Sequence, residues 1–318
     1  MGIGIALSGG GIRGIAHAGV LRALEENGIE IEAVAGTSAG SIVATLYAMG
    51  YKPYYIYVLF KKYAEEIINI GNAPIFNGIG NLMKTKKLGI SGLNDGTLFE
   101  KMFNELAIRK GVKVIGDIKM PLAISTVDVS EAKEYIITNC ASRENPYDNY
   151  ITEIGIGKAV RASSSFPAFF CPCEFKKHIF MDGGVLDTTP VLPLKQIYDK
   201  KVIAVNFVAD PVEENSDLMD IIMKTLDIMN NKIAEKSLSE SDFILTVPTD
   251  SAGLFDIDKL DICYKFGYDT VIKNIDKIKA ELDLCWTRKY FSFWVQFIGL
   301  FFCIITQKGF IWHIIFKE

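Results

Sequence analysis

The five residues Gly36-Thr37-Ser38-Ala39-Gly40 follow the apolar run Ala33-Val34-Ala35 and precede a stretch with helical character. A serine between a strand and a helix is the arrangement of a nucleophile elbow, whose tight turn requires small residues such as Gly36 and Gly40 around the serine. The start of the helix would also favour the negative charge that develops during acyl transfer. Taken alone, the motif fits equally well a Ser38 that only caps the helix.

A second glycine-rich segment, Gly9-Gly10-Gly11-Ile12-Arg13-Gly14, follows the apolar run Ile3–Leu7. Its glycine spacing matches a dinucleotide-binding loop, but the next predicted strand ends in Gly36-Thr37-Ser38 and lacks the acidic residue that holds a ribose. Successive glycines can instead bring backbone N–H groups close to an oxyanion. Parallel strands would place this loop beside Ser38, with Arg13 as a nearby cation that holds the loop or orients a substrate.

A nucleophilic serine needs a base, and the chain contains only three histidines. His17 falls inside the first predicted helix, His313 lies in an apolar tail, and His178 does not follow a convincing strand-end acid. A histidine-based triad is therefore disfavoured. Asp182, in Asp182-Gly183-Gly184, ends a short apolar stretch and has room around its carboxylate, although the same tripeptide also fits an ordinary turn.

Short apolar runs alternate with amphipathic stretches along the chain, which is typical of βαβ units and a parallel sheet. The predicted strands are Ile3–Leu7, Glu32–Ala35, Pro121–Val127, Glu134–Ile137, Val202–Phe207 and Phe243–Val247. The predicted helices begin and end near Arg13–Asn27, Ser38–Met49, Lys52–Asn69, Thr97–Ile108, Glu153–Arg161, Asp217–Lys236 and Asp258–Leu284. We expect one wound α/β domain, with residues 72–94 as an exposed excursion or lid.

Composition limits the partners and the setting of the protein. The 34 Lys and Arg residues are interspersed with 38 Asp and Glu residues, which argues against a nucleic-acid partner. The six cysteines form no CxxC pair and have no histidines at metal-ligand spacing, so no metal site is predicted. The first residues enter a strand-like run without a basic segment, so we expect no secretory signal and a reducing, cytoplasmic setting.

The C-terminal segment differs from the rest of the chain. Residues 290–307 are 18 consecutive uncharged residues rich in Phe, Trp and Ile, bracketed by Arg288-Lys289 and Lys308. That length reaches the lower limit for a membrane span. We therefore expect a hydrolase-like domain over residues 1–284 and an apolar helical tail over 285–318 that associates with membranes. Packing of the tail against a partner or its own domain is the alternative.

Taken in order, the glycine-rich loop, the elbow at Ser38 and the Asp182-Gly183-Gly184 tripeptide resemble the motifs of the patatin-like phospholipase family. The similarity extends to Ala162–Pro167, Asp187–Pro193, Ser241-Asp242-Phe243, Phe255 and Gly267-Tyr268. It covers about the first 280 residues, and the family domain proper corresponds to residues 5–195. The resemblance implies a three-layer α/β/α sandwich with a mainly parallel central sheet.

The resemblance also implies a mechanism. Ser38 would attack an ester carbonyl, Asp182 would act as the base of a Ser-Asp dyad, and Gly9, Gly10, Gly11, Arg13 and Gly14 would form the oxyanion loop, with Gly183 and Gly184 beside Asp182. No metal or cofactor is required. The expected activity is that of a phospholipase A or lysophospholipase acting on lipid esters at a membrane or micelle surface. The alternatives are a general carboxylesterase, a thioesterase, or a non-catalytic membrane-associated scaffold with the same fold.

Overall fold

The computed structural model describes residues 2–71, 95–140, 149–167, 169–207, 218–249, 252–253 and 256–282. The chain divides into two units, Met1–Ile275 and Asp276–Glu318, and the fold given below is that of the first unit, except that its last helix extends to Glu281. Three predictions lie outside the described residues: the lid at 72–94, the apolar tail, and the domain boundary after residue 284. They stay predictions.

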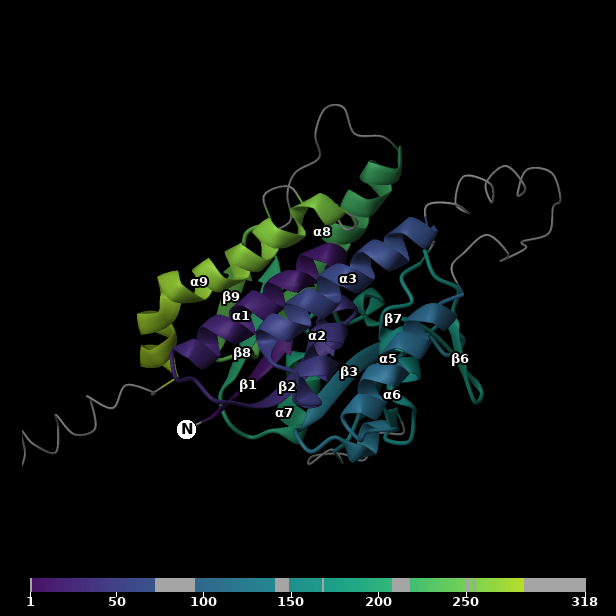
Figure 1. The fold of residues 1–318 in the computed structure, drawn as a ribbon, viewed down its shortest axis with the longest axis horizontal. Helices are drawn as coiled ribbons and strands as arrows, with labels where there is room; N and C mark the ends of the chain where they lie inside the picture. The colour runs from purple at the N-terminus through teal and green to yellow at the C-terminus, as the bar shows by residue number, and fades with distance from the viewer. Residues whose placement is uncertain are drawn as a thin grey trace, which may run out of the picture. The chain divides into compact units, whose positions relative to one another are not determined.

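A nine-stranded mixed sheet forms the centre of the described part (Figure 1). Its strands are β1 (Ile3–Leu7), β2 (Ile31–Thr37), β3 (Leu122–Asp128), β4 (Lys133–Thr138), β5 (Tyr150–Ile151), β6 (Cys173–Phe175), β7 (His178–Asp182), β8 (Val202–Phe207) and β9 (Phe243–Val247). The main path runs β5-β4-β3-β2-β1-β8-β9, and β7 pairs with both β3 and β6. The pairs β1–β2, β2–β3, β1–β8, β8–β9 and β4–β5 are parallel, whereas β3–β4, β3–β7 and β6–β7 are antiparallel.

Helices cover the sheet. They are α1 (Ile15–Glu26), α2 (Ala39–Ala48), α3 (Pro53–Gly71), α5 (Thr97–Arg109), α6 (Ile156–Ser163), α7 (Val191–Ile197), α8 (Leu218–Ser239) and α9 (Leu260–Glu281), with short 3-10 turns η1 (Gly11–Gly14), η2 (Ile115–Asp117), η3 (Gly183–Val185) and η4 (Ile257–Lys259). Figure 1 shows α1, α2 and α3 on one side of strands β1 and β2. The predicted α/β class with a mainly parallel sheet flanked by helices is confirmed.

Side-chain size along the central strands explains how α7 packs against the sheet. Small residues of three neighbouring strands share one buried cluster with α7, namely Ala6, Ala33, Ala35 and Ala123. A Cβ at Gly4 would lie only 2.9 Å from the ring of Tyr198, which follows α7. The helix can therefore approach the backbone of β1 closely, and Leu194 of α7 is fully buried there.

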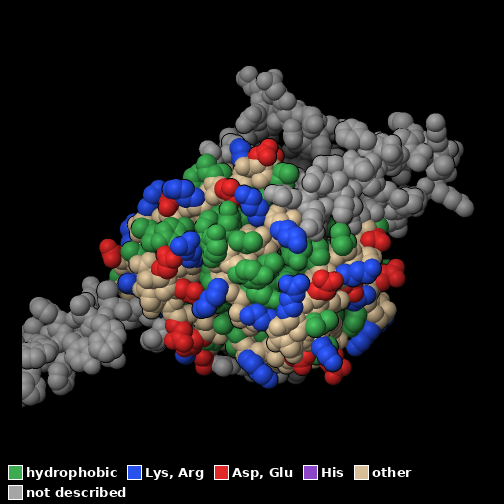
Figure 2. Space-filling model, viewed as in Figure 1, with side chains coloured by type: hydrophobic (Ala, Val, Ile, Leu, Met, Phe, Trp, Pro, Cys, Tyr) green, Lys and Arg blue, Asp and Glu red, His purple; other side chains and the backbone are tan. Residues whose placement is uncertain are grey.

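The surface carries charges of both signs. Figure 2 shows Lys and Arg side chains interspersed with Asp and Glu side chains over the visible face, with hydrophobic side chains between them. On α3, Tyr54 is 58% exposed, whereas Ile56 and Phe60 are buried. Within the described ranges, no helix combines the length and the apolar character that crossing a bilayer requires.

Candidate active site

Ser38 occupies a strained turn between β2 and α2. Its backbone has φ 52° and ψ −123°, a combination that residues other than glycine rarely adopt. The turn leaves no space around it: a Cβ on Gly36 would lie 2.3 Å from the Gly40 carbonyl oxygen, and one on Gly40 would lie 2.1 Å from the Leu7 carbonyl oxygen. Both positions therefore require glycine because of close backbone approach.

The backbone of Ser38 is held on both sides while its hydroxyl is left free of the helix. Its N–H donates to Ser163 Oγ at 2.9 Å, and its carbonyl accepts from Ser41 Oγ at 2.6 Å. The Ser38 side chain makes no capping hydrogen bond to α2. A purely capping role for this serine therefore has no support in the geometry.

Asp182 ends β7 and is 3% exposed. Its Oδ1 accepts a hydrogen bond from the Gly184 N–H at 2.8 Å, whereas its buried Oδ2 has no hydrogen-bond partner among the described residues. Burial raises the pKa of Asp182 to about 6, and the nearby Ser38 hydroxyl and the Gly184 N–H oppose that rise. The Ser38 hydroxyl is thus close enough to influence the carboxylate, although it forms no hydrogen bond to Oδ2. Such contacts commonly tighten only when substrate binds.

The glycine-rich loop leaves β1 at the same edge of the sheet. Leu7 pairs in parallel register with Gly36, so the loop and the elbow begin side by side. The Gly9 N–H donates to the Thr188 carbonyl at 3.0 Å, but the N–H groups of Gly10 and Gly11 have no acceptor among the described residues. Two free backbone donors next to a strained serine are suited to stabilise an oxyanion.

Arg13, which belongs to this loop, is buried. Its Nε donates to the Gly10 carbonyl at 3.1 Å, and its two terminal nitrogens donate to the carboxylate of Asp227 on α8 at 3.1 and 2.9 Å. The guanidinium also lies 5.8 Å from the centre of the Phe207 ring. Of the two roles expected for Arg13, the contacts match the holding of the loop.

One cavity of about 170 Å³ connects these groups. Its polar lining includes Ser38, Asp182, Gly10, Gly11, Arg13 and Asp227. Most of the remaining lining is apolar, notably Ile12, Ala39, Ile42, Leu46, Phe60, Phe103, Phe166, Phe169, Phe170 and Phe207. Gly14 ends η1 outside this lining, where it adjoins Ala39. The cavity therefore combines a small polar end with a large apolar wall.

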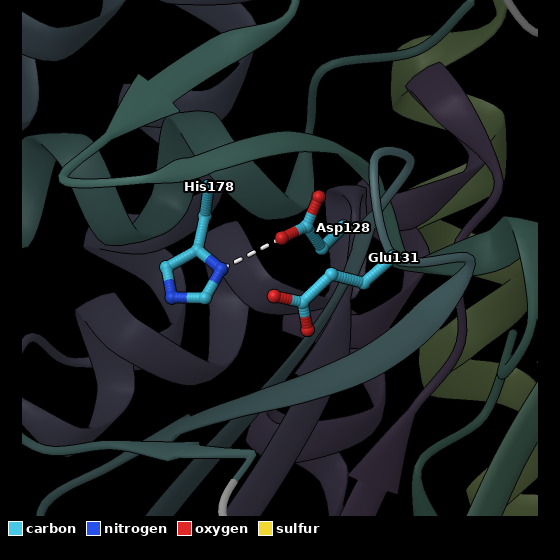
Figure 3. Close-up of side chains that lie close together, drawn as sticks. All are labelled: Asp128, Glu131 and His178. Carbon is cyan, nitrogen blue, oxygen red and sulfur yellow. Dashed lines mark hydrogen bonds and ion pairs between the residues drawn. The ribbon is translucent and has the colours of Figure 1, made fainter.

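The two described histidines are engaged elsewhere. His17 is fully buried with Nε2 2.8 Å from the Ser8 carbonyl oxygen, and burial lowers its pKa to about 4, with the Ser8 bond opposing. His178 Nδ1 lies 2.6 Å from Asp128 Oδ2, beside Glu131 (Figure 3). Neither histidine lines the cavity. The Asp128–His178 bond instead joins the start of β7 to the end of β3, and His313 lies outside the described residues.

Two contacts at the site were not predicted. Ser163, which fixes the Ser38 N–H, lies in the Ala162–Pro167 segment, but nothing in that segment singles it out from its serine neighbours. Asp227 is 214 positions away from Arg13, and an aspartate within an amphipathic helix carries no signal for such a contact. Both depend on tertiary packing.

An α/β fold with a strained serine at the end of a central strand defines a class of ester hydrolases. The family model described as Patatin-like phospholipase matches residues 5–195, which is more than half of the chain. The chain belongs to the patatin-like phospholipase family. Membership identifies it as a hydrolase of ester bonds and, in general terms, a lipid acyl hydrolase.

Several individual proteins are similar to this chain. The chain is 32% identical over 203 residues to the uncharacterized protein YqhO of Bacillus subtilis, with 62% of this chain and 68% of that protein covered. It is 29% identical over 204 residues to lysophospholipase NTE1 of Scheffersomyces stipitis, with 64% of this chain but only 12% of that protein covered. Among solved structures, VipD from Legionella pneumophila has a TM-score of 0.47 and 16% identity, covering 87% of this chain and 67% of VipD.

Proposed function

We propose that the protein is a serine lipid acyl hydrolase of the phospholipase A or lysophospholipase type, with Ser38 as nucleophile and Asp182 as base. The observation that carries this proposal is that Asp182 lines the same cavity as the strained Ser38, while its buried Oδ2 has no hydrogen-bond partner among the described residues. An acceptor without a donor, next to a hydroxyl that caps nothing, is suited to receive a proton.

The reaction has two halves. Ser38 Oγ bonds to the ester carbonyl carbon while Asp182 takes the hydroxyl proton, and the Gly10 and Gly11 N–H groups stabilise the oxyanion. The carbonyl carbon then loses the leaving alcohol, which receives the proton from Asp182. Water attacks the resulting acyl-serine, Asp182 accepts a proton from the water, and the fatty acid departs as Ser38 Oγ regains that proton.

The apolar wall supports an acyl chain as the bound group. Three residues on one face of α2 line the cavity, Ala39, Ile42 and Leu46, with the spacing of successive helical turns. Leu46 is eight positions beyond Ser38, which corresponds to about 12 Å along a helix. An extended hydrocarbon can therefore run along α2 from the nucleophile, which favours lipid esters over small polar esters.

Purified wild-type protein and two variants, Ser38→Ala and Asp182→Asn, test the proposal. The substrates are lysophospholipids, diacyl phospholipids, triglycerides and acyl thioesters, with products resolved by acyl position. We expect the wild type to release fatty acid from lysophospholipid or phospholipid, and each variant to lose activity by at least about a thousandfold. Ser239→Ala, which removes an exposed hydroxyl at the end of α8, is the matched control.

A fluorophosphonate probe gives an independent measurement. Its phosphorus should bond to Ser38 Oγ with loss of fluoride, and peptide mapping should find the label there in the wild type and nowhere in Ser38→Ala. Full turnover by either variant, or a label at another residue, would exclude the dyad. Preference for thioesters over all lipid esters would retain the dyad and replace the substrate class.

A further inference from the structure

The oxyanion loop is tied to a helix outside the matched family region. Asp227 lies on α8, whereas the family match ends at residue 195. Both oxygens of the Asp227 carboxylate accept from Arg13, and the two side chains are only 13% and 5% exposed. Two parallel hydrogen bonds at this degree of burial fix both the position and the plane of the guanidinium.

The same guanidinium holds one atom of the loop. Arg13 Nε donates to the Gly10 carbonyl oxygen, so all three guanidinium nitrogens are engaged within the protein. Asp227 therefore also balances the charge of Arg13 inside the cavity. The Arg13 guanidinium is therefore held in one orientation, with Nε directed towards Gly10.

The Gly10 carbonyl accepts from the Arg13 backbone N–H at 3.2 Å as well as from Arg13 Nε, and these two contacts together determine the direction of the next N–H group. In a trans peptide the C=O and the following N–H point in opposite directions, so a bond that fixes Gly10 O also fixes Gly11 N–H. Gly11 N–H is one of the two loop donors that have no acceptor among the described residues. A cation at the carbonyl additionally polarises the amide and makes its N–H a stronger donor.

We propose that Asp227 is a positioning residue for the oxyanion loop, acting through Arg13 on the Gly10–Gly11 peptide. This inference rests on the proposed function, because it assigns to Gly11 N–H a role in stabilising the oxyanion. The role of Asp227 is exerted in the transition state. Its loss should lower the rate of acyl transfer while leaving the apolar wall and the binding of the acyl chain intact.

The test uses the full chain and Asp227→Asn, which keeps the side-chain shape and removes the charge. Glu235→Gln is the matched control, since Glu235 is an exposed acid of the same helix that pairs with Lys232. Two rates are measured: kcat and KM with a lysophospholipid, and the second-order rate of fluorophosphonate labelling at Ser38. For Asp227→Asn we expect kcat and labelling to fall about tenfold or more, with KM changed less than twofold. The control should match the wild type.

Two further readouts separate positioning from simple destabilisation. The acidic limb of the kcat/KM profile should stay at the wild-type pH in Asp227→Asn, because Asp227 is not the base. The double variant Arg13→Lys with Asp227→Asn should lose no more rate than Arg13→Lys alone, because both changes break one chain of contacts. If Asp227→Asn does not fold, Arg13→Lys carries the same test, because lysine cannot bond Gly10 and both Asp227 oxygens in this geometry.

Any of three results would overturn the inference. The first is a folded Asp227→Asn that is labelled at the wild-type rate, and the second is a double variant whose losses of rate are the sum of the two single losses. The third is an Asp227→Asn whose only change is in KM. If Asp227→Asn does not fold, an unchanged labelling rate in Arg13→Lys would also overturn it. A wild type that hydrolyses no ester and takes no label at Ser38 would instead overturn the proposed function, and with it the premise of this inference. The two failures are therefore distinguishable.

Discussion

Ser163 Oγ accepts a hydrogen bond from the Ser38 N–H and donates its own hydrogen to the Ser125 carbonyl, at 2.9 and 2.7 Å. This relay anchors the strained turn to β3, because Ser125 lies on that strand. A residue at positive φ retains that conformation only when its surroundings hold it. The turn at Ser38 is thus held by a neighbouring helix and strand as well as by its own residues.

Ser163→Ala should reduce stability and activity together. Ser163 is fully buried, so the change leaves the Ser38 N–H and the Ser125 carbonyl without their partner. We expect a loss of about 1–3 kcal/mol in the free energy of unfolding and a clear fall in kcat. Urea unfolding and lysophospholipid turnover measure the two effects, with Ser239→Ala as the control. Unchanged kcat would show that the turn does not need this relay.

The activity should increase with pH around the pKa of Asp182. Only the ionised carboxylate can accept the Ser38 proton, and burial raises that pKa to about 6. We expect kcat/KM to fall about tenfold per pH unit below that value and to level off above it. A profile measured between pH 4 and 8 checks this. A flat profile across that range would exclude Asp182 as the base.

Asp182→Asn should make the folded protein more stable at neutral pH. Because the folded-state pKa is raised from 3.8 to about 6, the folded state binds the proton more tightly than the unfolded state. The contribution of the Asp182 carboxyl to the free energy of unfolding is therefore fully present below pH 3.8. It is lost as the pH rises through 6, and the loss amounts to up to about 3 kcal/mol.

An asparagine does not ionise and avoids that loss. Urea unfolding should find Asp182→Asn more stable than the wild type at pH 7.5, with the difference shrinking towards pH 4. Equal pH dependence in the two proteins would contradict the raised pKa. The expected result would also mean that the carboxylate is kept at the expense of stability.

Ile42→Phe should shift the chain-length preference towards shorter acyl groups. Ile42 is half-buried and lines the cavity one turn into α2 from Ser38. A larger ring there would fill the space that a long chain occupies, while a short chain would still reach the nucleophile. Comparing kcat/KM for hexanoyl and palmitoyl esters measures the shift, and Ile108→Phe, at a position 66% exposed, is the control. An unchanged ratio would place the acyl chain elsewhere.

Much of the sheet could be predicted from residue patterns because the strands are apolar and bounded by polar residues. β1, β8 and β9 have the predicted bounds, and β2 and β3 differ from them by one or two residues. The predicted helix starting at Arg13 instead begins as the 3-10 turn η1, and α1 starts at Ile15. The positive φ of Gly11 and the bond from Arg13 N–H to the Gly10 carbonyl account for that tighter first turn.

The missed elements are short or depend on distant partners. α7 has seven residues and β6 has three, which is too short for a hydrophobic period to emerge. The two antiparallel pairings of β3 were not predicted either, because they depend on partners that a strand's own pattern does not reveal. Residue types alone could nominate Ser38 and Asp182, but the burial that raises the pKa of Asp182 required the packed fold.

The strand that leads to Ser38, β2, and the strand that ends at Asp182, β7, pair with the same edge of β3, because β4 occupies the other edge over residues 123–128. Thr37 pairs with Ser125, and Asp182 pairs with Thr126, the next residue along β3. The backbones that carry the two groups therefore meet at adjacent positions of β3, about 3.3 Å apart along that strand, and main-chain hydrogen bonds to β3 set this spacing. Helices around the cavity can change in sequence, or shift to admit different lipids, without altering the distance between these two backbones.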